Sequence, residues 1–173
     1  MQTKLDLCSM ALLKLGETPI QSLNADTPAA QLARTLFEPT MDMLLAMHPW
    51  RFATQCFQLI KNNEGNFLIP PQVLRVLRCD GAVVGNCIMS PGETMNITAV
   101  VRVPSEKYPA YFASVAITKL AMEFCIPLIG DKNVFSMLAA LYETELQSAK
   151  FIDSSASNVH QNITDFSLIN ARF

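Results

Sequence analysis

Hydrophobic residues recur every three or four positions near the N-terminus, which is the spacing of one face of an α-helix. The stripe consists of Leu5, Cys8, Leu12 and Leu15. It predicts a helix over about residues 3–15. Gly16 follows directly, at the position where a glycine in the left-handed conformation commonly ends a helix.

A second helix is predicted over about residues 28–48. Asp26 or Thr27 can cap its N-terminus, and Pro28 suits the first helical position because its missing N–H would have no partner there. The apolar face comprises Leu32, Leu36, Leu44 and Met47. Pro39 lies inside this stretch, so we expect a kink there or a division into two helices.

Two later stretches show the same helical spacing. The first predicts a helix over about residues 108–126, and Pro127 and Gly130 are expected to end it. Its core stripe is Ile117, Leu120, Ala121 and Phe124. The second predicts a helix over about residues 132–152, with an apolar face of Phe135, Leu138, Tyr142, Leu146 and Ala149.

Residues 53–103, between the second and third helices, have the character of β-strands. "VLRVLRC" and "AVVGNCIM" flank Asp80-Gly81, a signal for a tight hairpin, and a turn at Pro91-Gly92 leads into the alternating stretch "NITAVVRV". Together with "QCFQLI" they predict a small antiparallel meander of three or four strands, which Pro104 ends. The fold class is therefore α+β and mainly α: a single domain over residues 1–152, with a bundle of about four helices and an inserted β-meander.

The stretch "MHPWRFA", residues 47–53, holds the only tryptophan and one of the two histidines of the chain. Pro49 disfavours helical geometry at His48, so the chain must turn there. Trp50 and Phe52 are then expected in an extended segment with both side chains on one side. We interpret Pro49, Trp50 and Phe52 as a structural corner that anchors the sheet to the bundle.

The C-terminal residues 153–173 predict a flexible tail that docks on another surface. "DSSASN" is polar and offers little to pack. The apolar residues that follow would be unusual in a solvated tail. The partner-binding candidates are Val159, Ile163, Phe166, Leu168 and Phe173. They pack either on their own domain or on another chain.

The composition is that of a globular protein, with 50% hydrophobic and only 16% charged residues. The net charge is −2, and the basic residues never form a block, which argues against direct nucleic-acid binding. Charged residues interrupt the N-terminal stretch, so no secretory signal is expected, and no uncharged apolar run approaches the length of a membrane span.

Motifs for catalysis or metal binding are absent from the sequence. The five cysteines are widely spaced and include no C-x-x-C pair, so buried free thiols are the preferred interpretation. A Cys56/His48 nucleophile pair is formally possible, but His48 lies at a helix end. Glu143 and Glu145 are two positions apart on a helix and face different directions. We expect no catalytic residue, metal or cofactor.

Several quoted segments, taken in order, resemble the head-to-tail connector (adaptor) proteins of tailed bacteriophages. The resemblance is greatest to the tail-tubular-protein-A and tail-accessory-factor group of short-tailed phages. "ALLKLGETPIQSL" resembles the first helix of the family and its Leu-Gly-Glu turn, and "LLAMHPWRFA" the end of the second helix and the segment after it. "FLIPPQVLRVLRC" is similar to the entry into the small sheet. "YPAYFASVAITKLAMEFCIPLIG" and "LYETELQSAKFID" resemble the third and fourth helices.

The resemblance covers roughly residues 1–152 and implies a structural virion protein. Such proteins form a ring of about twelve subunits beneath the portal protein ring. The ring extends the DNA channel without sequence-specific binding, helps retain the genome, and provides the platform for a tail or nozzle protein. The resemblance implies a location at the head–tail junction of the virion after synthesis in the host cytoplasm, with no membrane partner. It also implies that the C-terminal tail reaches the portal or a neighbouring subunit.

Two alternative functions fit the same sequence. A cytoplasmic protein–protein interaction module unrelated to virions would also fit a globular chain without catalytic motifs. A tail-associated cell-wall hydrolase would need a carboxylate or cysteine in a cleft. Arg75, Arg78 and Arg102 could line a lumen or an interface, although a solvated strand face is the simpler interpretation.

Overall fold

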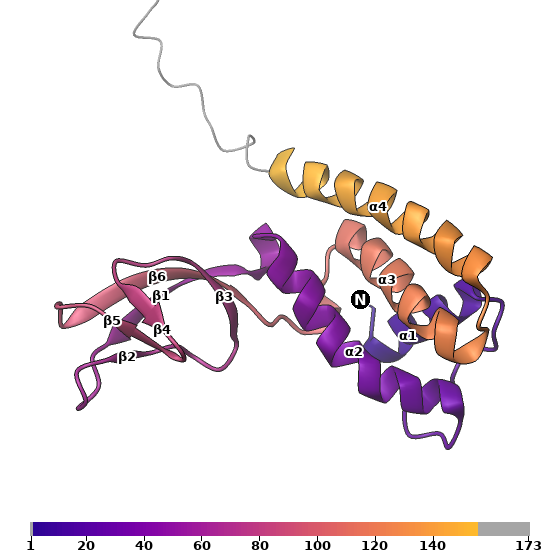
Figure 1. Ribbon diagram of the computed structural model, residues 1–173, viewed down its shortest axis with the longest axis horizontal. Coiled ribbons are helices and arrows are strands. Elements are labelled where there is room, and N and C mark those ends of the chain that lie inside the picture. The colour runs from indigo at the N-terminus through magenta and orange to yellow at the C-terminus, as the bar shows by residue number, and fades with distance from the viewer. Residues whose placement is uncertain (1, 156–173) are drawn as a thin grey trace, which may run out of the picture.

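The structure, a computed structural model, describes residues 2–155. It comprises four α-helices and two small antiparallel sheets of three strands each. The helices lie side by side at one end of the molecule and the strands lie at the other (Figure 1). The predicted α+β, mainly α class is confirmed.

The first two helices begin at the caps that the sequence offers. Helix α1 spans Lys4–Lys14, and the Thr3 hydroxyl accepts the backbone N–H of Asp6 in a capping box. Gly16 follows with φ +78°, and the chain turns out of the helix there. Helix α2 spans Pro28–Met47, with Thr27 as the N-cap.

Pro39 does not divide α2, so that alternative was wrong. The helix runs without interruption through all twenty residues. Proline removes one N–H donor and frees one carbonyl of the preceding turn. Pro39 and Thr35, four residues earlier, are both exposed, and water can satisfy the freed carbonyl. The buried residues of α2 hold both halves against the bundle.

The last two helices extend further than their predicted ends. Helix α3 spans Ala110–Leu128 and includes Pro127 in its last turn, so this proline does not stop it. The end comes at Gly130, whose φ is +70° and whose N–H donates to the Cys125 carbonyl at 3.0 Å. Helix α4 spans Lys132–Ser155, three residues beyond the predicted boundary.

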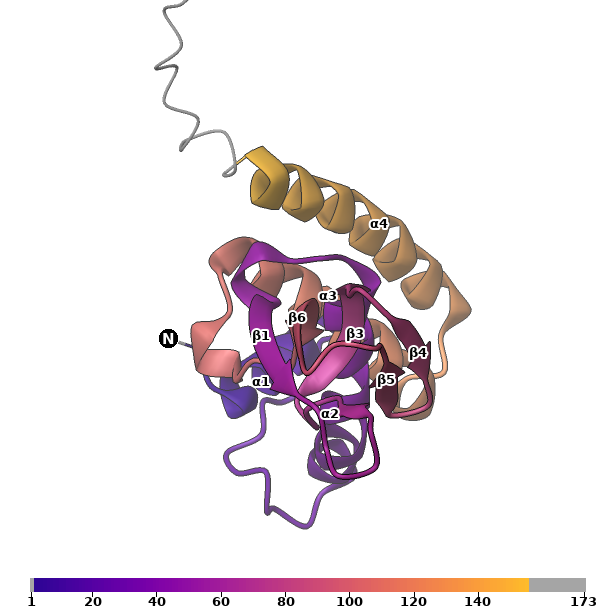
Figure 2. The ribbon, with the colours of Figure 1, turned by 90° about the vertical axis from the view of Figure 1, so that its left-hand side faces the viewer.

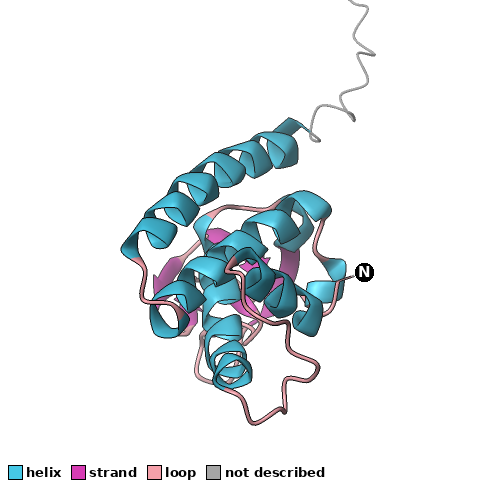
Figure 3. Ribbon diagram, turned by 90° about the vertical axis from the view of Figure 1, so that its right-hand side faces the viewer, coloured by secondary structure: helices cyan, strands magenta, loops and turns pink. Residues whose placement is uncertain are grey.

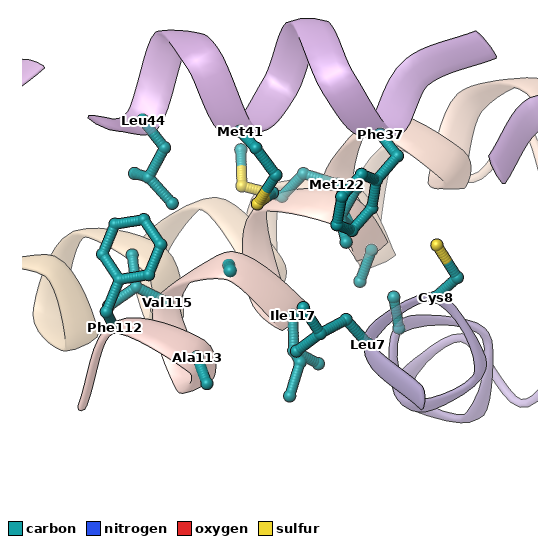
Figure 4. Close-up of a cluster of buried hydrophobic side chains, with 14 of the residues drawn as sticks. Leu7, Cys8, Phe37, Met41, Leu44, Phe112, Ala113, Val115, Ile117 and Met122 are labelled. Atoms are coloured by element: carbon teal, nitrogen blue, oxygen red, sulfur yellow. The ribbon is translucent and has the colours of Figure 1, made fainter. Parts of the chain in front are cut away.

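Helix α3 is the centre of the bundle. Phe37, Met41 and Leu44 of α2 lie against it from one side, and Leu7 and Cys8 of α1 lie on another (Figure 4). The view along the bundle shows α4 on the outside (Figure 3). Helix α3 is long and apolar enough to cross a membrane, but 56% of that stretch is buried inside the protein. This is the property of a core helix.

The strands form two sheets instead of one succession of neighbours. Strands β1 (Thr54–Ile60), β6 (Thr94–Val101) and β3 (Val73–Arg78) form one sheet in that order. Strands β2 (Phe67–Leu68), β5 (Cys87–Met89) and β4 (Ala82–Val84) form the other. The sheets enclose a small core of their own that includes Leu59, Phe67, Ile88, Met95 and Ile97. Figure 2 shows this end of the molecule.

The hairpin predicted at Asp80-Gly81 was wrong. Strands β3 and β4 flank these residues but belong to different sheets. The tight hairpin joins β4 to β5 at Gly85-Asn86, where Gly85 has φ +58°. Gly81 has another role, because a Cβ there would lie 2.6 Å from the Met89 carbonyl oxygen. It allows the chain to pass close to β5.

Candidate interaction surfaces and the corner that holds them

The corner begins where α2 ends. His48 has extended backbone geometry before Pro49, and the chain then buries Trp50 completely. The Trp50 indole Nε1 donates to the Leu44 carbonyl oxygen at 3.0 Å. This carbonyl lies in the last turn of α2, where helical partners run out, so the indole both fills the core and satisfies a helix end.

The predicted extended geometry after Trp50 was wrong, because Arg51–Ala53 form a short 3-10 helix. The anchoring contacts are nevertheless extensive. The ring centroids of Trp50 and Phe52 lie 5.1 and 4.9 Å from that of Phe112, and Tyr108 lies 4.8 Å from it. One aromatic cluster therefore contains residues from both connections between bundle and sheets, the one after α2 and the one before α3.

Asp153 joins the end of α4 to this corner, although it was predicted to lie in the flexible tail. Its side chain is 2% exposed. The carboxylate accepts the Arg51 backbone N–H at 3.1 Å and the Tyr111 hydroxyl at 2.7 Å. The His48 Nε2 lies 3.7 Å away. The burial and the hydrogen bond to Asp153 both raise the pKa of Tyr111, so its hydroxyl stays protonated and remains a donor.

Lowering the pH from 7 to 5 is expected to reduce the free energy of unfolding through His48. Burial lowers the pKa of His48 below its ordinary value, an effect that Asp153 opposes and that Lys150 and Arg75 reinforce. Between the lowered pKa of His48 in the folded chain and its ordinary pKa in the unfolded chain, the unfolded chain binds more protons than the folded one. The free energy of unfolding therefore falls as the pH falls.

Urea unfolding of the His48→Gln variant at several pH values measures this contribution. We expect a shallower pH dependence for His48→Gln than for the natural chain. Equal slopes for natural chain and His48→Gln would contradict the assignment.

The three candidate arginines divide into different roles. Arg102 forms a two-pronged ion pair with Asp42 of α2, with Nε 2.7 Å from Oδ1. Arg75 donates from Nη1 to the Ala46 carbonyl oxygen at 2.8 Å. Both side chains therefore tie the sheets back to α2. Arg78 is exposed at the end of β3.

The residues considered for catalysis are not brought into one site. His48 faces Asp153 and Trp50, whereas the Cys56 sulfur lies 3.7 Å from the Thr98 hydroxyl on the exposed side of β1 and β6. Glu145 faces Thr118 and Lys14, and Glu143 is exposed elsewhere on α4. Within residues 2–155, no group of three or more His, Cys, Asp or Glu side chains is placed to hold a metal ion.

Two open cavities within residues 2–155 are lined by few charged residues. An open cavity of about 600 Å³ lies between the loop after α1 and the end of α3, and Glu17 is the one titratable residue in its lining. Another of about 440 Å³ is lined by Lys4 and Glu38, which pair with each other at 2.9 Å, by Arg102, which is paired with Asp42, and by Glu106.

The exposed side of α4 is nearly uncharged. Among its exposed residues only Lys132 and Glu143 carry a charge. Four large apolar side chains stand in solvent on this helix, with Met137 68% and Phe151 74% exposed and Leu141 and Ile152 also exposed. Solvent-facing sides of helices are normally rich in charged residues. We call the surface formed by these four apolar side chains the α4 face, and it is a candidate for contact with another protein.

The outer face of the β2–β5–β4 sheet is a second apolar surface. Residues directly opposite in the ladders share a face, and they place together Leu68, Ala82, Val84, Cys87 and Met89. Leu68, Val84 and Met89 are each more than half exposed. The outer face of the other sheet is mostly polar, with Cys56 opposite Thr98 and Gln58 opposite Asn96. Within one protein, therefore, one sheet follows the usual polar-outward pattern and the other departs from it.

The tail candidates Val159, Ile163, Phe166, Leu168 and Phe173 lie outside the described residues. Sequence reasoning placed interaction in this tail and missed both the α4 face and the apolar sheet face. The sequence signal of the α4 face is the uncharged run "SMLAALY", in which Met137 and Leu141 lie outside the predicted apolar stripe. Asp153 left no local signal, because its partners lie far away in the chain. No protein-family model matches the chain, and no curated protein is significantly similar to it.

Proposed function

We propose that the chain is a non-enzymatic structural subunit, a head-to-tail connector that forms a ring beneath the portal of a tailed phage. The segments within residues 1–152 that resemble the connector proteins, and their order along the chain, support this proposal. In this function the ring has about twelve subunits, extends the DNA channel, helps retain the genome and carries the tail or nozzle protein at the head–tail junction. The net charge of −2 suits a channel that DNA must pass without being gripped.

The α4 face carries the proposal. A ring needs two different surfaces on each subunit that meet head to tail. The α4 face runs along the bundle, and the apolar sheet face belongs to the other end of the molecule (Figure 1). Two uncharged apolar surfaces at different places on one subunit suit such contacts better than they suit a solitary monomer.

Co-sedimentation with the portal ring encoded in the same genome tests the function. We expect saturable binding of the full chain, and loss of most binding in a chain that ends at Ser155, where the tail is removed. The cut must follow Ser155, since a cut at Ile152 would also remove the buried Asp153. If neither the portal nor DNA-filled heads bind the intact chain, the connector function is wrong and a general interaction module takes its place.

A double variant on the α4 face separates assembly from tail docking in the same experiment. Met137→Asp with Leu141→Asp is expected to retain its melting temperature and to bind the portal without forming a closed ring. Glu143→Gln, at an exposed residue of the same helix outside the apolar group, is the matched control and should assemble normally. Normal ring formation by the double variant would exclude the α4 face as a subunit contact.

A further inference from the structure

The two sheets leave an open seam between them. On one side β1 and β2 contact each other, and on the other side lie the edge strands β3 and β4 (Figure 2). In the described part of the chain no ladder joins β3 to β4. An open cavity of about 370 Å³ lies along this seam, and its apolar lining consists of Ile69, Val73, Leu74, Val76 and Val83.

The two edges of the seam differ in how they are protected. Strand β3 has two irregularities in its register and carries Arg75 and Arg78, features that edge strands use to discourage further pairing. Strand β4 pairs regularly with β5 and has no charge, proline or bulge. Its three residues are all exposed, and Val83 borders the cavity. The free edge of β4 is therefore open to another strand.

A series of contacts connects the end of α4 with this seam. Asp153, near the end of α4, contacts His48, which directly follows α2. Two residues before His48, the Ala46 carbonyl oxygen accepts a hydrogen bond from the Arg75 guanidinium at 2.8 Å. Arg75 itself lines the cavity. From Ser155, the eight residues 156–163 can span at most about 28 Å.

Residues 164–169 have the pattern of a strand that covers an apolar cavity. In "TDFSLI", polar and apolar residues alternate from Asp165 to Leu168, with Ser167 between Phe166 and Leu168. The segment lacks proline and glycine. As a strand it would place Phe166 and Leu168 on one face, with Thr164 at the edge of that face, and Asp165, Ser167 and Ile169 on the other.

We propose that residues 164–169 of the same chain add to the free edge of β4 as an extra strand, with Phe166 and Leu168 in the seam cavity. A three-residue edge offers few hydrogen bonds, which would hold a separate peptide weakly. The tether to α4 keeps the segment at high effective concentration and makes the short contact sufficient. The same segment belongs to the tail that docks on the portal in the proposed function, so on that function the portal competes with the seam for it.

Hydrogen exchange on the intact chain tests the proposal. The readout is the exchange of the β4 amides and of the amides of residues 164–169. In the natural chain we expect both sets to exchange at least about tenfold more slowly than in the variant Phe166→Asp/Leu168→Asp, with rates independent of protein concentration. Ser167→Asp, whose side chain would face away from the cavity in the added strand, is the matched control and should keep the natural protection.

Each other outcome overturns the proposal. Equal exchange in the natural chain and the double variant would mean that the tail does not cover the seam. Protection that grows with protein concentration would mean that the strand comes from a second copy. Neither result depends on portal binding. A negative result here therefore does not contradict the connector function, and a negative co-sedimentation result does not contradict the addition of residues 164–169 to β4.

Discussion

Trp50→Ala is expected to lower the free energy of unfolding by about 3–5 kcal/mol. The side chain is fully buried and contacts aromatic residues on both sides of the junction between bundle and sheets. Its removal leaves a large cavity and also deprives the Leu44 carbonyl of its indole partner. Both effects act on the end of α2, so the helix end and the sheet attachment are weakened together.

Chemical unfolding followed by circular dichroism measures this loss. Trp50→Phe should be intermediate, because it keeps much of the ring volume and loses the N–H donor. Arg51→Ala is the matched control at the next position: its side chain is exposed and its backbone N–H is retained, so we expect a change within about 0.5 kcal/mol. An unchanged unfolding midpoint for Trp50→Ala would show that Trp50 is no anchor.

The helices were predictable because their signals are local. The Thr3 and Thr27 caps, the stripe with Leu5 and Leu12, and the glycines that follow α1 and α3 all act within a few residues of the element they define. The positions of the helix ends follow less directly from local signals. Pro127 was expected to stop α3, but it lies one residue before the last residue of the helix, where Ile126 and Pro127 are exposed, and it removes only one N–H donor of the helix.

Strand pairing was only partly predictable because it depends on distant residues. Asp80-Gly81 and Gly85-Asn86 are both two-residue turn signals. The structure uses the second for the hairpin, since the stretch after β3 has to cross from one sheet to the other. Local alternation shows that residues form strands, but the partner of each strand is set by the core between the sheets, where Phe67 and Ile88 face Met95 and Ile97.

At the corner, too, some features follow from local sequence and others depend on distant residues. The burial of Trp50 could be inferred from its type and from the turn at Pro49. The role of Asp153 could not be inferred, since it lies in a polar stretch and its partners Arg51 and Tyr111 are 102 and 42 residues away. The sequence predicted a boundary between body and tail at the residue that fixes the last turn of α4 to the body.

Asp153→Ala is expected to lower the free energy of unfolding by about 2–4 kcal/mol. A buried carboxylate is tolerated only where hydrogen bonds replace water. Here the partners are a backbone N–H and the Tyr111 hydroxyl, with His48 beside them. Removal of the carboxylate leaves the N–H of Arg51 and the hydroxyl of Tyr111 without their acceptor in a poorly hydrated place.

The loss has a local signature that distinguishes it from the effect of Trp50→Ala. Hydrogen exchange should become faster first in the last turns of α4, since Asp153 holds that end of the helix to the corner. Tyr111→Phe removes one of the hydrogen bonds and should cost about 1 kcal/mol. Glu143→Ala, an exposed carboxylate on the same helix, should change stability by less than about 0.5 kcal/mol. If Asp153→Ala were as mild as Glu143→Ala, the carboxylate would not hold α4 in place, and the tail would begin before Asp153 after all.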